Sequence, residues 1–228
     1  MNLKVAETIA SSFIADDMAD VEWEKFESSM LIEVKRGEEV FTSSAVAIQR
    51  NILLTCAHSV ENFEAGRVFW NPRYNPESKN YLSFKKVVIH PDYCQSKSNY
   101  ANDLAIIVLN GNLPSKARPA KIHANPFSVK KGMQAHRIGF GAREGGNIRT
   151  WTNPEILDYD SGSKSFILKD EFGKVGDSGG PVYLKINGKY KLFALHSTKE
   201  GADKSYTVSV SDHMHWIEKH LPLKQIDA

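Results

Sequence analysis

The sequence contains few cysteines and no long hydrophobic run. Its 228 residues include two cysteines, so at most one internal disulfide can form and a small disulfide-stabilised scaffold is excluded. The longest uninterrupted apolar run, residues 104–109, is six residues long. A membrane-spanning helix needs about 20 such residues, so we expect no transmembrane segment and no membrane partner.

The N-terminus lacks the pattern of a signal peptide. Lys4 supplies one positive charge, but Glu7 interrupts the apolar stretch, and Asp16 and Asp17 follow soon after. We therefore expect a cytoplasmic protein if Met1 is the native start.

Basic clusters are missing as well. The net charge is +2, and residues 1–40 hold ten acidic and four basic residues, which leaves +8 for the rest of the chain. The lysines and arginines are scattered and accompany no recognised binding motif, so we expect no nucleic-acid partner. Two interpretations of this charge asymmetry are open. The acidic segment masks the basic remainder of the chain within the same molecule, or the asymmetry arose by chance.

The chain has an ordinary globular composition and many short β-rich runs. Apolar residues make up 41% and charged residues 25% of the sequence. Short strands with regular turn signals between them predict a sandwich or barrel. The expected strands are residues 30–34, 40–48, 51–55, 81–89, 104–109, 135–140, 166–169, 182–186, 192–195 and 205–210. We also expect loosely helical structure over residues 2–27, a linker over 114–126 and a helix over 212–220 that begins with Asp212 as N-cap.

Three short motifs contain the residues for a chemical reaction. They are Leu54-Thr55-Cys56-Ala57-His58, then Asn102-Asp103 before the buried run 104–109, and then Gly176-Asp177-Ser178-Gly179-Gly180-Pro181. A serine hydroxyl is a poor nucleophile at neutral pH, so it needs a base, and that base needs an orienting partner. Histidine, aspartate and serine supply this set, and the glycines allow backbone N–H groups to point at a developing oxyanion.

These motifs resemble the trypsin/chymotrypsin-like serine protease family, in which the catalytic residues follow the chain order His, Asp, Ser. The resemblance covers residues 28–221 and implies an all-β fold of two antiparallel six-stranded β-barrels with a C-terminal α-helix. It places barrel one at about 28–115, barrel two at about 127–211 and the helix at about 212–221. Residues 1–27 would form an acidic segment with a pro- or regulatory role.

The resemblance also implies a role for each residue of the motifs. His58 is the general base and acid, Asp103 orients it, and Ser178 is the nucleophile. The backbone N–H groups of Gly176 and Ser178 form the oxyanion hole, and Ser197 hydrogen-bonds the triad aspartate. The reaction is peptide hydrolysis through an acyl-enzyme. We expect a monomer that acts on protein or peptide substrates and uses no cofactor and no metal. Members of this family are commonly secreted, which is the alternative to a cytoplasmic location.

The activation motif of the family is missing. Its members usually become active when cleavage frees an amine that pairs with the aspartate before the nucleophile, here Asp177. The nearest match by spacing is Ile14, which follows Phe13 rather than a basic residue. One hypothesis makes Ile14 the new N-terminus after cleavage by another protease. A second gives Asp177 another partner, such as a lysine, and a third is a latent state relieved by a binding partner. A catalytically silent fold that acts as a protein-binding module is the alternative from another functional class.

The substrate pocket is the least determined part of the site. The family's pocket-floor position corresponds to Phe172, which argues against cleavage after Lys or Arg unless a gapped alignment brings in Asp170 or Glu171. His196 resembles the histidine with which glutamate-specific members hold an acidic side chain. Lys174 and Lys199 fall near the same pocket. An acidic, a narrow apolar and a basic preference before the cut bond therefore all remain open.

The two cysteines lie near triad residues. A disulfide between Cys56 and Cys94 is conceivable for this reason, but buried free thiols are the favoured interpretation.

Overall fold

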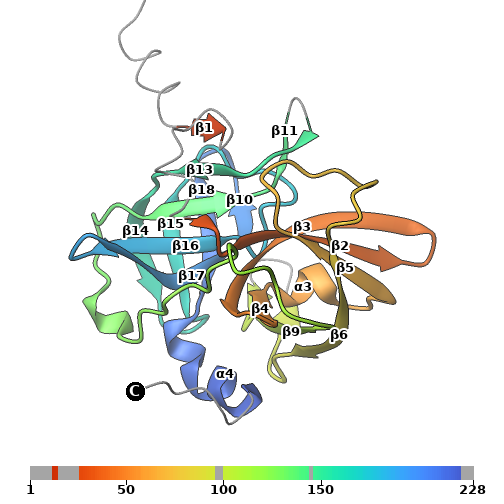
Figure 1. Cartoon of the computed structure of the whole chain (residues 1–228). Coiled ribbons are helices and arrows are strands. Elements are labelled where there is room, and N and C mark those ends of the chain that lie inside the picture. The colour runs from red at the N-terminus through yellow and green to blue at the C-terminus, as the bar shows by residue number, and fades with distance from the viewer. Residues whose placement is uncertain (1–11, 15–25, 96–99, 144–145, 222–228) are drawn as a thin grey trace, which may run out of the picture.

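The computed structural model describes residues 12–14, 26–95, 100–143 and 146–221 (Figure 1). Within them the chain is mostly β-structure arranged in a closed barrel and a larger curled sheet, with the short helix α4 (Met214–His220) near the end. The predicted all-β fold with a C-terminal helix is confirmed.

Six antiparallel strands close the first barrel. Their order is β2-β3-β4-β9-β6-β5. Alternate residues of β2, namely Met30, Ile32 and Val34, point into the barrel core, because successive side chains of a strand point to opposite faces. The bounds are β2 (Ser29–Arg36), β3 (Glu39–Gln49), β4 (Ile52–Thr55), β5 (Ala65–Phe69), β6 (Leu82–Ile89) and β9 (Ala105–Leu109).

Eight strands form the second sheet, rather than the six expected. Their order is β1-β13-β10-β16-β17-β18-β15-β14. Six of them, from β10 to β14, curl round until Glu155 of β14 forms a bridge with Gln134, just before β10. The two additional strands, β13 and β1, extend the sheet beyond β10. The bounds are β1 (Ser12–Ile14), β10 (His136–Gly139), β13 (Thr150–Thr152), β14 (Glu155–Asp160), β15 (Ser165–Lys169), β16 (Pro181–Ile186), β17 (Lys189–Glu200) and β18 (Lys204–Ser209).

The helical predictions were partly wrong. Ser12–Ile14 form the strand β1 and not a helix, and the rest of the predicted 2–27 segment lies outside the described residues, apart from 26 and 27. At the other end, Asp212 belongs to a 3-10 turn, η4 (Ser211–His213), and His213 is the N-cap of α4. Ile217 of α4 is fully buried.

A shared core joins the two halves. It combines Leu54 and Ile106 of the first barrel with Ile138 and Leu195 of the second sheet, and Ile217 of α4 packs on the same cluster. The remaining short elements are α3 (Ala57–Val60), η3 (Pro126–Ser128) and two small ladders, β7 (Cys94–Gln95) with β8 (Tyr100–Ala101) and β11 (Ala142–Arg143) with β12 (Gly146–Asn147). Both halves are thus held against each other, which fixes residues from each at their common boundary.

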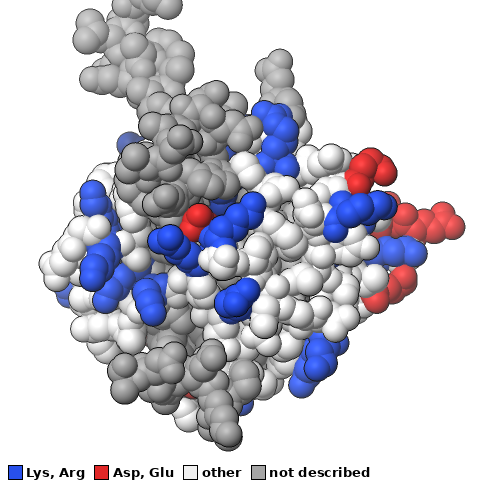
Figure 2. All heavy atoms as spheres, viewed as in Figure 1, with Lys and Arg blue, Asp and Glu red and all other residues white. Residues whose placement is uncertain are grey.

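The surface shows no basic stripe on the face drawn in Figure 2. Basic side chains are spread over both halves, and acidic side chains gather mainly at the edge of the first barrel. No helix among the described residues has the length and apolar character needed to span a bilayer.

Candidate active site

His58 stands on α3, a single helical turn directly after a fully buried strand. All four residues of β4 are buried, and Cys56 is extended before the chain turns into α3. Thr55, at the end of β4, donates its hydroxyl to the carbonyl of Ser44 at 2.8 Å. This contact ties the end of β4 to β3 and so fixes where α3 begins.

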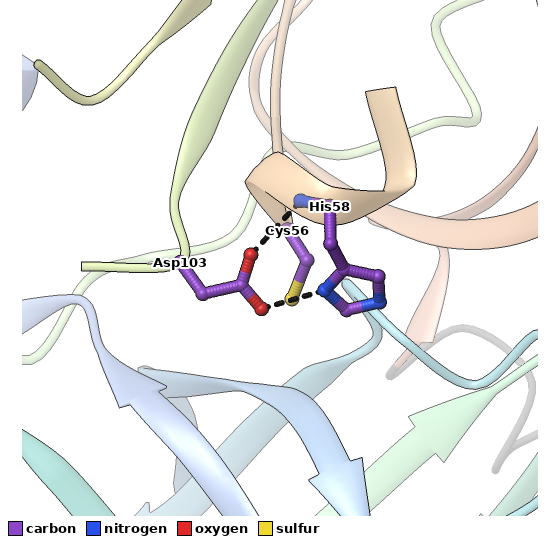
Figure 3. A group of neighbouring side chains, drawn as sticks. All are labelled: Cys56, His58 and Asp103. Atoms are coloured by element: carbon purple, nitrogen blue, oxygen red, sulfur yellow. Dashed lines mark hydrogen bonds and ion pairs between the residues drawn. The ribbon is translucent and has the colours of Figure 1, made fainter. Parts of the chain in front are cut away.

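Asp103 is fully buried next to His58 (Figure 3). It comes just before β9 and follows Asn102, whose φ of 51° turns the backbone there. The carboxylate accepts the backbone N–H of His58 at 3.0 Å and lies 2.7 Å from its Nδ1. Ser197 donates its hydroxyl to Asp103 Oδ2 at 2.5 Å. Burial works against the charged carboxylate, but the hydrogen bonds from His58 and Ser197 outweigh it and hold the pKa of Asp103 below its usual value.

Ser178 lies in the loop before β16 of the second sheet and faces the same hollow as His58. Its hydroxyl donates to the carbonyl of Ser197 at 3.0 Å. Its own carbonyl accepts the N–H of Ser44 at 2.9 Å and the hydroxyl of Ser43 at 2.8 Å. The first barrel therefore fixes the backbone of the serine that the second sheet presents.

Gly176 and Ser178 have backbone N–H groups that are available to a ligand. Within the described residues, neither amide donates to a protein acceptor. The carbonyl of Gly176 is held by the hydroxyl of Ser44 at 2.8 Å. Gly176 has a φ of 98°, which a residue with a side chain rarely adopts. Two such donors beside a serine hydroxyl can stabilise an oxyanion that forms on an attacked carbonyl.

Comparison with known proteins identifies the family of the chain. A family model described as Trypsin matches residues 24–217. The chain belongs to the trypsin family. It is 25% identical to chymotrypsin-like elastase family member 1 of Macaca fascicularis, over 80% of each chain. It is 24% identical to the Homo sapiens protein of that description, over 79% of this chain and 81% of the other. The solved structure of HL collagenase has a TM-score of 0.75 at 19% identity and covers 89% of this chain and 96% of that one.

Asp177 is the most heavily bonded carboxylate in this trypsin-family site. It is fully buried, and its Oδ1 accepts the N–H of Gly141 at 2.7 Å. Its Oδ2 accepts the N–H of Lys174 at 2.9 Å and lies 2.9 Å from both Arg137 and Arg143. Burial opposes the charge, but the two arginines outweigh it and hold the pKa of Asp177 far below its usual value. The partners of Asp177 are therefore two arginines, where the sequence suggested an amine or a lysine.

Ile14 does not reach Asp177 in the uncut chain. It lies in β1, where it pairs with Thr150 of β13, and Thr150 pairs in turn with Gly139 of β10. Gly139 packs directly against the carboxylate of Asp177. Two strand spacings, about 10 Å, thus separate Ile14 from the strand that contacts Asp177.

The hollow beside Ser178 contains most of the predicted pocket residues. Its lining includes Lys174, His196 and Lys199, together with Gly173, Val175, Ser197 and Thr198. Lys199 donates from its ammonium group to the carbonyl of Glu171 at 3.0 Å. Phe172 is outside this lining, and its carbonyl accepts from Arg143 at 3.2 Å.

Buried charges lie beneath the hollow. Asp170 is almost fully buried, and its Oδ2 lies 2.8 Å from Arg137 Nε and 4.0 Å from His196 Nδ1. His196 is 3% exposed, and its Nδ1 has no hydrogen-bond partner among the described residues. Burial and the nearby Arg137 lower the pKa of His196 well below its usual value, so this imidazole is neutral at pH 7.

The side chain of Cys56 lies between Asp103 and the ring of His58 in the view of Figure 3. Its thiol, His58 Nδ1 and an oxygen of Asp103 are all within 4.8 Å of one another. The imidazole and carboxylate are already bonded to each other, and the thiol points to the carbonyl of His196 at 3.1 Å. Burial and the charge of Asp103 raise the pKa of the Cys56 thiol well above its usual value, so it stays protonated. Cys94 is also a free thiol, but it is exposed rather than buried.

Sequence reasoning missed three residues of this site. Ser44 bonds the carbonyl of Gly176, and Arg137 and Arg143 bond Asp177. Only Arg137 left a signal in the sequence, because an arginine inside the expected strand 135–140 needs a partner where it is buried.

Proposed function

We propose that the chain is a serine endopeptidase that hydrolyses peptide bonds through an acyl-enzyme on Ser178. One observation carries this proposal: Asp103 bonds both His58 Nδ1 and Ser197, while Ser178 faces the same hollow as His58. This network holds the imidazole in the tautomer that leaves its other nitrogen able to take a proton.

The chemistry then follows in two stages. Ser178 Oγ attacks the substrate carbonyl carbon and gives its proton to His58, while the amides of Gly176 and Ser178 stabilise the oxyanion. The carbon–nitrogen bond breaks, and His58 returns the proton to the leaving amine. Water then attacks the ester by the reverse proton path and frees Ser178.

An acidic residue before the cut bond is the preference that the pocket supports best. Lys174 and Lys199 line the hollow, and His196 forms part of its wall. A substrate carboxylate could replace the Glu171 carbonyl that now accepts from Lys199. Asp170 is not available to a basic substrate side chain, because Arg137 pairs with it below the pocket.

Covalent labelling tests the reaction. Incubation of the full chain with a fluorophosphonate should add one label, detected by intact mass, and S178A should add none. S178A should also lose at least about 10⁴-fold in peptide hydrolysis. Ser115 is exposed and does not line the hollow, so S115A is the matched control and should behave as the wild type. No label on the wild type, with or without the N-terminal segment, would favour the silent binding module instead.

Substrate profiling tests the preference. The residue before the cut bond should be Glu or Asp, and K199M should lower the Glu-over-Gln ratio by about five- to tenfold. K204M is the control, because Lys204 is exposed on β18 and does not line the hollow. A profile dominated by small apolar residues or by Lys and Arg would contradict the acidic preference while leaving the reaction intact.

The latent state is the other feature that the sequence left open. Cleavage near Ile14 or a partner that binds residues 1–27 would be needed if the oxyanion donors were displaced in the uncut chain. Deletion of residues 1–11 leaves β1 in place and tests for masking by that part of the segment. Unchanged activity would contradict the masking hypothesis.

A further inference from the structure

The environment of Asp177 differs from that of an ordinary surface ion pair. Arg137 is 1% exposed and bridges two buried carboxylates, at 2.8 Å to Asp170 and 2.9 Å to Asp177. Arg143 supplies the second positive charge, with its guanidinium bonded to Asp177 at 2.9 Å. The neutral His196 adds no charge here. Two buried carboxylates are therefore neutralised by two guanidinium groups. Removal of either arginine would leave a buried carboxylate without a compensating positive charge.

The carboxylate of Asp177 has no acceptor capacity to spare. A carboxylate offers about four lone-pair sites. Asp177 receives the N–H groups of Gly141 and Lys174 and one guanidinium nitrogen each from Arg137 and Arg143. A second nitrogen of Arg143 lies 3.4 Å from Oδ1. An ammonium group that entered this site would have to displace one of the arginines.

The position of Asp177 in the chain links this carboxylate to the proposed oxyanion donors. It lies between Gly176 and Ser178, whose N–H groups are the proposed oxyanion donors. Gly141 and both arginines hold the side chain of Asp177, which restricts the backbone on either side of it. We propose that Arg143, together with Arg137, is a positioning residue that keeps the oxyanion donors in place in the uncut chain, so that activity needs no new N-terminal amine. This inference rests on the proposed function.

Arg143 is the better of the two arginines to vary. Arg137 is enclosed between two carboxylates, so its variants can fail to fold. Arg143 lies on the small β11–β12 ladder and is 19% exposed at its side chain. Its guanidinium also donates to the carbonyls of Gly141 and Phe172, which ties this ladder to the loop before Ser178.

The first experiment compares labelling rates on the full chain. Wild type, R143A and R143K react with a fluorophosphonate, and intact mass confirms that all 228 residues are present. We expect the wild type to react without cleavage and R143A to react about 100-fold more slowly, the usual effect of losing one oxyanion donor. Millimolar methylguanidinium should restore part of the R143A rate, and R143K should lie between the two. R118A is the control, since Arg118 is exposed and pairs only with Glu27 among the described residues.

Kinetics separate positioning from general loss of structure. R143A should lower kcat for a peptide substrate while KM changes less than about threefold, because the pocket itself is kept. An R143A rate equal to that of the wild type would overturn the proposal. Labelling of the wild type only after cleavage near Ile14 would also overturn the proposal about Arg143. That result would leave the proposed function intact. Absence of labelling and hydrolysis in both the cut and uncut chain would overturn both.

The pH profile gives an independent readout. The charged and titratable groups that face Asp177 are Arg137, Arg143, Asp170 and His196. An α-amine loses its charge near pH 8, whereas a guanidinium keeps its charge above pH 12. The kcat/KM of the wild type should therefore stay level through this range, and R143K should decline towards about pH 10.4. The proposal would be contradicted if the kcat/KM of the wild type declined around pH 8 to 9 and acetylation of the α-amine caused the same loss.

Discussion

The hydroxyl of Ser44, on β3 of the first barrel, donates to the carbonyl of Gly176, in the loop before β16 of the second sheet, at 2.8 Å. The hydroxyl oxygen of Ser44 also accepts the backbone N–H of Phe140 at 2.9 Å. Ser44 is fully buried, so these two bonds are shielded from water. One side chain thus connects the first barrel to the backbone that carries the proposed oxyanion donors.

Replacement of Ser44 by alanine should reduce both stability and activity. S44A leaves a buried N–H and a buried carbonyl without this partner, and each such loss costs about 1–3 kcal/mol. The free energy of unfolding, measured with urea, should fall by at least about 1 kcal/mol. The kcat for peptide hydrolysis should fall about tenfold or more, because Gly176 is then free to move. S115A is the control, and an S44A enzyme with full kcat would show that Ser44 does not position Gly176.

Ser197 should influence the acid side of the pH–rate profile. Its hydroxyl is one of the donors that hold the pKa of Asp103 below its usual value, so S197A should raise this pKa. Asp103 must be charged to orient His58, and activity is therefore lost as pH falls through its pKa. We expect the loss of kcat/KM that follows protonation of Asp103 to move to higher pH in S197A, with a fall of about tenfold on the plateau, the effect of one hydrogen bond to a charged group. S197T keeps a hydroxyl and should retain the wild-type acid limb where it folds.

Two glycines allow backbone strain and steric clash to be measured separately. Gly179 has a φ of 79°, and an added Cβ would lie 2.2 Å from the carbonyl oxygen of Ser44. Gly132 has a φ of 83°, but an added Cβ would meet nothing within 4 Å. G132A should therefore cost only about 1–2 kcal/mol of unfolding free energy, from the left-handed backbone alone. G179A should cost more than about 4 kcal/mol or prevent folding, which thermal denaturation would show. Equal losses in the two variants would contradict this packing argument.

Stability should fall on mild acidification. Burial and the nearby His213 lower the pKa of His90 to about 4, and burial also lowers that of His196. Their ordinary pKa in the unfolded chain is about 6.5, so the unfolded chain takes up protons that the folded protein does not. Stability is then complete above pH 6.5 and declines as pH falls from about 6.5 towards 4, by up to about 1.4 kcal/mol per pH unit for each histidine.

Urea unfolding from pH 7.5 to 4.5 would measure this decline. H90Q should reduce the slope of unfolding free energy against pH by the contribution of one histidine. The buried aspartates affect a separate range, since their lowered pKa values act only below about pH 3.9. A flat stability between pH 6.5 and 5 would contradict the neutral, buried state of these two imidazoles.

The strands that the sequence predicted are short β-rich runs bounded by turn residues. All ten expected strands are present within a few residues of their predicted bounds. Strand β5 was missed because Gly66 and Arg67 interrupt its pattern. Gly66 is required by packing, because an added Cβ would lie 2.2 Å from the ring of Phe84. Strand β14 was missed because its aspartates and exposed positions resemble a loop.

Local sequence alone determined the motifs around His58, Asp103 and Ser178 and the β-structure that carries them. Strand alternation and glycine at a positive φ are local properties, so one sequence suffices to predict them. Tertiary structure decided which groups meet across the boundary of the two halves. It paired Asp177 with Arg137 and Arg143, placed Ser44 beneath Gly176 and left Phe172 outside the hollow. The physical reason is that a buried charge needs a partner in space, and the chain can supply that partner from any strand that the fold brings near.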